Sequence, residues 1–67
     1  MDFHVSLTSA SIRDRSLIRR YYIFEDGNEV GILITTDKKF TEIQPRKTAS
    51  KAVLEADEKT WEDLANG

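Results

Sequence analysis

The feature that most constrains this chain is the dipeptide Asp26-Gly27, which lies between two runs rich in apolar residues, 16–25 and 29–36. Asp-Gly favours a type I′ turn, because both central residues of that turn need a positive φ, and such turns join adjacent antiparallel strands. The two flanking runs are rich in β-branched and aromatic residues, as strands are. The centre of the chain is therefore predicted to be a β-hairpin.

Two registers are open for this hairpin. A two-residue loop pairs Phe24 with Glu29 and Tyr21 with Ile32. A three-residue loop shifts the pairing by one residue and places Glu25 directly opposite Glu29. Because like charges directly opposite each other are unfavourable, we prefer the first register.

A further strand is predicted on each side of the hairpin. Phe3, Val5 and Leu7 alternate with polar residues, and the apolar parity then changes near Thr8-Ser9, which either a β-bulge or a break in the strand would explain. After a second turn, the run FTEIQ returns as a strand that ends near Pro45, since proline cannot extend a central ladder. The expected strands span about residues 2–8, 16–25, 29–36 and 39–44.

The C-terminal segment favours a helix over residues 48–65. It has no proline, and Lys51, Glu55 and Lys59 are spaced four residues apart, a charge ladder that supports a helix. An alternative keeps residues 52–54 as a short strand and starts the helix at Asp57, which would then act as the N-cap. We prefer the single helix.

These elements predict an α+β fold: a three- or four-stranded antiparallel β-meander with a C-terminal helix packed on one sheet face. Residues 1–67 are expected to form a single small domain. A chain of this length buries only about 60% of the surface that its unfolded form exposes, so its core is small.

The composition argues against most catalytic chemistry. The chain has no cysteine, which excludes disulfides, thiolate zinc sites and cysteine nucleophiles. It has one histidine, His4, and no glycine-rich phosphate loop. From the sequence we expect no group to have the neighbours that catalysis needs, whether to shift its pKa or to hold an intermediate. We therefore expect a protein that is not an enzyme, with no catalytic residues, no metal site and no cofactor.

Charge and hydropathy point to a soluble, cytoplasmic protein that does not enter the membrane. The net charge is −2, and no signal peptide is visible at the N-terminus. The longest apolar run is far shorter than the roughly 20 residues that span a bilayer. A net charge of this size produces no strong electrostatic field that would attract nucleic acid or repel or attract a lipid surface.

The remaining signal is an excess of apolar sheet surface. One helix covers one sheet face, and the face that carries Tyr21 and Ile23 is the richer one. The other face is expected to carry Phe40 and the five candidate contact residues Ile18, Arg20, Tyr22, Phe24 and Leu33. Apolar patches with polar rims often mark contact surfaces. We therefore expect a small regulator or inhibitor that occupies a partner protein, or forms a homodimer, through these five residues.

The alternative is a nucleic-acid-binding module that uses the arginine-rich second strand. The stretch RDRSLIRRYYIF combines arginines with aromatic residues, as many sheets that bind single strands do. Strand alternation sends Arg19 and Arg20 to opposite faces, however, and the pI near 5.3 is not the basic footprint of such a domain.

Overall fold

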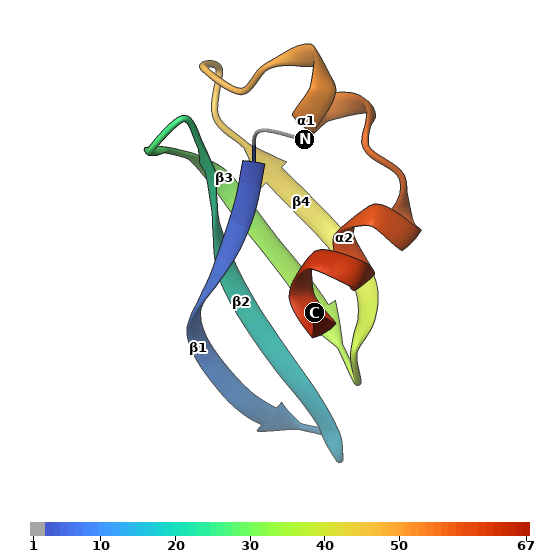
Figure 1. Ribbon diagram of the computed structural model, residues 1–67. Coiled ribbons are helices and arrows are strands. Elements are labelled where there is room, and N and C mark those ends of the chain that lie inside the picture. The colour runs from blue at the N-terminus through green and yellow to red at the C-terminus, as the bar shows by residue number, and fades with distance from the viewer. Residues whose placement is uncertain (1–2) are drawn as a thin grey trace.

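The computed structural model describes residues 3–67 as one antiparallel sheet followed by two short helices (Figure 1). The strands are β1 (Phe3–Arg13), β2 (Ser16–Glu25), β3 (Asn28–Thr36) and β4 (Lys39–Pro45), and they lie side by side in chain order. The helices are α1 (Lys51–Glu55) and α2 (Glu58–Asn66). The predicted α+β class, an antiparallel meander with C-terminal helix packed on the sheet, is confirmed.

All three strand connections are two-residue turns in which both residues have positive φ. The first residue of each turn is an aspartate, Asp14, Asp26 or Asp37, with φ of 51°, 52° and 51° respectively. This is the type I′ pattern that Asp26-Gly27 predicted, repeated at both ends of the sheet. Asp37 also accepts a hydrogen bond at Oδ1 from the Leu17 N–H (2.9 Å), so the third turn is tied to the start of β2.

The β2–β3 hairpin contains both of the registers that the sequence left open. Next to the turn, Phe24 pairs with Glu29, as in the preferred register. A β-bulge then makes Val30 an extra residue, and beyond it Tyr21 pairs with Leu33 instead of the predicted Ile32. Gly31 permits this local packing, because a Cβ there would lie 2.8 Å from the Gln44 carbonyl oxygen of β4.

The first strand is longer than predicted. The expected start at residue 2 lies outside the described residues, and the expected end near residue 8 is wrong, because β1 continues to Arg13. Of the bulge and the break that the sequence left open, the strand has the bulge: Leu7 pairs with Tyr21 and Ser9 with Arg20, which leaves Thr8 as the extra residue. Beyond the bulge, the residues up to Arg13 still pair with β2, so they belong to the same strand.

The prediction of a single helix over residues 48–65 is wrong. Of the alternative, the strand over 52–54 is wrong, and the second helix with Asp57 as its N-cap is confirmed. The chain forms α1 and then breaks at Asp57, which is the N-cap of α2 and accepts a hydrogen bond at Oδ1 from the Thr60 N–H (2.8 Å). The Thr60 side chain, and after it the Thr60 N–H, lower the pKa of the Asp57 carboxyl, because hydrogen bonds to the carboxylate stabilise its ionised form. Val53 of α1 and Trp61 of α2 both reach the core.

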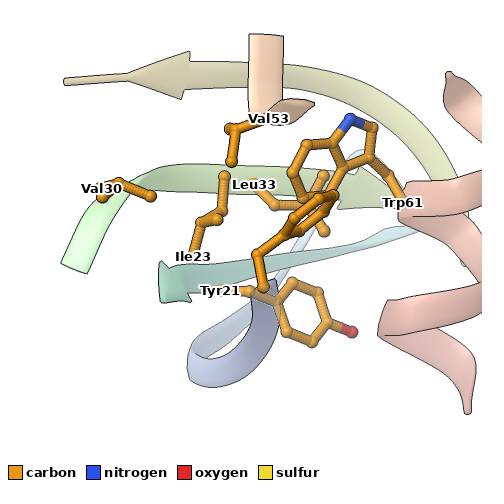
Figure 2. Close-up of a cluster of buried hydrophobic side chains, with 7 residues drawn as sticks. Tyr21, Ile23, Val30, Leu33, Val53 and Trp61 are labelled. Carbon is orange, nitrogen blue, oxygen red and sulfur yellow. The ribbon is translucent and has the colours of Figure 1, made fainter. Parts of the chain in front are cut away.

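The core lies between the two helices and one face of the sheet, as Figure 2 shows. Trp61 of α2 is 1% exposed, and its ring centroid is 5.2 Å from that of Phe3. The buried apolar residues are Phe3, Tyr21, Ile23, Val30, Leu33, Val53 and Trp61. Both helices contribute to this one cluster, so within residues 3–67 the opposite sheet face has no helix over it.

None of the helices in this part of the chain is long and apolar enough to cross a bilayer.

Candidate protein-binding face

The sheet face that points away from the helices is called the open face here. Its position follows from strand alternation: residues next to buried Tyr21, Ile23 and Leu33 point to the other side. The apolar residues of the open face are Ile18, Tyr22 and Phe24 from β2, and Ile32 and Ile34 from β3. They come from the two central strands, so the apolar patch lies in the middle of the sheet.

Aromatic rings form a row across the open face. His4 of β1 stacks on Phe24 of β2, with ring centroids 5.4 Å apart and an interplanar angle of 15°. Tyr22 meets Phe24 edge-on at 6.2 Å. Tyr22 remains 41% exposed although it packs against this neighbour. These contacts hold the rings in place and leave part of their surface available to another molecule.

An ion pair lies at the end of the open face near the β2–β3 turn. Arg46 donates hydrogen bonds from Nε and a terminal nitrogen to the two carboxylate oxygens of Glu29, at 2.8 and 2.9 Å. These bonds lower the pKa of Glu29 and raise that of Arg46. Arg46 is exposed and Glu29 is half-buried, so water screens the pair in part and it orients side chains more than it stabilises the fold.

Further polar groups complete the rim. Arg20 is exposed on β2, and Glu42 and Gln44 pair with Ile34 and Ile32 from the edge strand β4. An apolar centre with a polar rim is the usual anatomy of a protein–protein interface. Tyrosine and arginine are also the residue types that most often dominate binding energy at such sites.

The structure brings together four of the five predicted contact residues. Ile18, Arg20, Tyr22 and Phe24 share the open face, whereas Leu33 is fully buried on the helix side. Placing Leu33 at the contact surface was wrong, because the bulge at Val30 exchanges the two faces of β3 beyond it. Placing Phe40 on this face was also wrong, because Phe40 pairs with buried Thr35 and packs against the core.

The sequence analysis also missed two residues of this face. Ile32 and Ile34 occupy the places on β3 that Leu33 was expected to share. A signal for this exchange was present in Gly31, since a glycine inside a strand often marks a bulge. Reading Gly31 in this way would have assigned Ile32 and Ile34 to the open face.

The arginines of the second strand do not form one patch. Arg20 is exposed beside Tyr22, while Arg19 pairs with Ala10 and Thr35 and lies on the helix side. Arg13 and Arg15 are at the far turn of the β1–β2 hairpin. Of these four arginines, Arg20 is therefore the one that the central stretch of β2 places on the open face.

A polar cleft of about 560 Å³ lies at the β2–β3 turn, beside the start of α1. Ser50 donates its N–H to Glu25 Oε1 (3.1 Å) and its hydroxyl to Glu25 Oε2, which ties α1 to the hairpin. Within the described residues, no group of histidine and acidic side chains is arranged to hold a metal ion. The cleft residues are thus accounted for by a structural contact.

Comparison of the chain with protein-family models, with curated proteins and with solved structures found no match.

Proposed function

We propose that this chain is a small, non-enzymatic protein-binding regulator or inhibitor, and that it acts in the cytoplasm by occupying a partner protein through its open face. One observation carries the proposal: five apolar side chains gather at the centre of a sheet face that has no helix over it within residues 3–67. A surface of this kind loses unfavourable contact with water when another protein covers it.

The open face is suited to binding because its anchors are held rigidly. Tyr22 and Phe24 are on a central strand that is paired on both sides, and each ring packs against another ring. Binding therefore costs little additional ordering of these side chains. Truncating an aromatic residue at the centre of such an interface typically costs about 2 kcal/mol or more of binding free energy.

The same face offers a second mode, in which the open faces of two copies pack on each other. In either mode the chain acts by covering the surface of another protein molecule, and Tyr22 lies at the centre of the open face that makes this contact. An inhibitor of this type blocks whatever its partner would otherwise bind at the covered surface.

The test uses purified wild-type protein, Tyr22→Asp and Leu54→Asp as baits in separate capture experiments from cell extract. Leu54 is exposed on α1, on the helix side of the molecule, so its variant controls for the added charge. We expect a protein that binds to the wild type and to Leu54→Asp and is lost with Tyr22→Asp. Identical retention by all three baits would refute a role for the open face.

The structure also favours one second candidate, binding of single-stranded nucleic acid. His4, Phe24 and Tyr22 form an aromatic row, and Arg20 is exposed on the same strand face as Tyr22. Bases stack on such rings while arginine contacts phosphate. Phosphate contacts make affinity fall steeply between about 50 and 200 mM salt, whereas an apolar protein interface responds weakly. Binding of a labelled oligonucleotide at both salt concentrations separates the two functions.

A further inference from the structure

The outer edge of β1 is the longest exposed strand edge of the molecule. Within residues 3–67, β1 pairs with β2 on one side and has no strand on the other. Every residue from Ser6 to Arg13 is exposed, and the turn end of the β1–β2 hairpin extends past the helices (Figure 1). Leu7 and Ile12 are 55% and 79% exposed, which is unusual for large apolar side chains on the helix side of a sheet.

This edge lacks the features that normally prevent pairing with another strand. Natural edge strands are blunted by charged residues, especially lysine, and by proline. Residues 5–12 of β1 contain neither a charged residue nor a proline. The opposite edge of the same sheet, β4, carries Lys39, Glu42 and Pro45. The two edges of one sheet therefore differ, and of the two it is the unprotected edge that carries strongly exposed apolar residues, Leu7 and Ile12.

The bulge gives β1 a symmetric pattern of polarity. Before the bulge, Val5 and Leu7 point to the helix side; after it, Ala10 and Ile12 do, because Thr8 is the extra residue. Ser6 and Ser11 occupy equivalent places on the open side. Read from either end toward Thr8-Ser9, the strand presents the same alternation of apolar and polar side chains.

We propose that β1 pairs antiparallel with β1 of a second copy of this chain, about a two-fold axis between Thr8 and Ser9. Leu7 of one copy then lies opposite Ala10 of the other, and Val5 lies opposite Ile12. On the open side, Ser6 lies opposite Ser11. Each apolar residue faces an apolar residue and each polar residue a polar one.

The backbone hydrogen bonding is compatible with the same register. In an antiparallel strand, alternate residues direct both backbone groups to the same neighbour, and a bulge shifts this alternation by one residue. Leu7 and Ala10 therefore direct their backbone groups to the same side of β1, as do Ser6 and Ser11. In the proposed register, the residue numbers of each pair sum to 17, so a residue whose backbone N–H and C=O point outward lies opposite another such residue. Among the registers that meet this condition across the bulge, this one pairs residues 4–13 of one copy with residues 4–13 of the other.

The resulting dimer joins two four-stranded sheets into one of eight strands. In the dimer, Leu7 of each copy is covered by Ala10 of the other copy, and Ile12 by Val5. The two open faces become one continuous surface that presents two copies of Tyr22. The inference uses different residues from the proposed function and does not rest on it.

Disulfide trapping tests the register directly, because the chain has no cysteine of its own. Directly opposite residues have Cβ atoms about 4.5–5.5 Å apart, close to the reach of a disulfide. Leu7→Cys and Ala10→Cys are prepared as separate proteins of different mass and oxidised alone and as a mixture. We expect the mixture to form the mixed disulfide at least about tenfold faster than either variant forms a disulfide with itself. Equal rates would overturn the register.

Sedimentation of three further samples tests the surface. We expect the wild type and Tyr22→Asp to be dimers and Ile12→Glu to be a folded monomer, with folding checked by circular dichroism. A monomeric wild type overturns the proposal, and so does a monomeric Tyr22→Asp beside a dimeric Ile12→Glu. The last result would instead assign self-association to the open face, so the two interfaces are distinguishable.

Discussion

Tyr21 and Tyr22 are consecutive residues of β2 that lie on opposite faces of the sheet, one in the core and one on the open face. Tyr21 is 5% exposed among the buried residues, and Tyr22 is 41% exposed. The two positions share a residue type, a strand and almost the same distance from each turn. They therefore form a matched pair for separating stability from binding.

Tyr21→Asp is expected to unfold the protein, because it places a charge in a dry cluster without a partner. Tyr22→Asp is expected to change the free energy of unfolding by less than about 1 kcal/mol, since surface substitutions have small effects. Urea denaturation of both variants measures the difference. If Tyr22→Asp also unfolds the chain, the open face is part of the core and the proposed function fails.

Trp61→Ala is expected to lower the free energy of unfolding by about 3–5 kcal/mol, because it removes the largest side chain of the core and leaves a cavity. The matched control is Leu54→Ala on the exposed side of α1, which should change stability by about 0.5 kcal/mol or less. Both values come from chemical denaturation followed by circular dichroism. A loss below about 1 kcal/mol for Trp61→Ala would contradict its central place in the core.

Lys38→Gly is expected to stabilise the protein. Lys38 has φ of 69° in its turn, a conformation that costs a residue with a Cβ about 1–2 kcal/mol, and glycine loses part of this gain through its greater freedom when unfolded. The net increase should be about 0.5–1 kcal/mol. Gly27→Val, at the equivalent position of the second turn, should destabilise instead. If Lys38→Gly and Gly27→Val changed the free energy of unfolding in the same direction and by the same amount, the two turns would not share one conformation.

Acid is expected to weaken the fold through two carboxyls whose pKa values are lowered. Asp57 caps α2 by accepting from Thr60, and Glu29 accepts from Arg46. A folded-state pKa below the unfolded value means that the contribution is present above the unfolded pKa and is lost as pH falls through the folded pKa. Stability should therefore decline below the ordinary pKa range of these two carboxyls.

The pH dependence is measured by urea denaturation across the acid range. Asp57→Asn keeps a capping side chain and removes the charge, so its stability should fall less steeply with acid than that of the wild type. Asp63→Asn, on the same helix, serves as the control. An unchanged slope in Asp57→Asn would show that the cap does not titrate with folding.

Local chemistry made most of the fold predictable. The Asp26-Gly27 turn, the two faces of β2 and the bulge near Thr8 followed from backbone preference and from the parity of apolar residues. Leu33 was misplaced because one extra residue, Val30, reverses the faces of β3, and alternation alone does not detect such an insertion. The helix that starts at Asp57 was the alternative offered by the sequence, and the single helix was preferred over it because the Lys51, Glu55 and Lys59 ladder also fits an unbroken helix.

The most direct test of the open face is the affinity of the captured partner protein for the wild type and for Tyr22→Asp, measured at about 50 and 500 mM salt. The account predicts that the substitution weakens binding by about 30-fold or more, which corresponds to about 2 kcal/mol, and that salt changes the wild-type affinity only slightly. Equal affinities for the two proteins, or a loss of more than about 100-fold with salt, would contradict it.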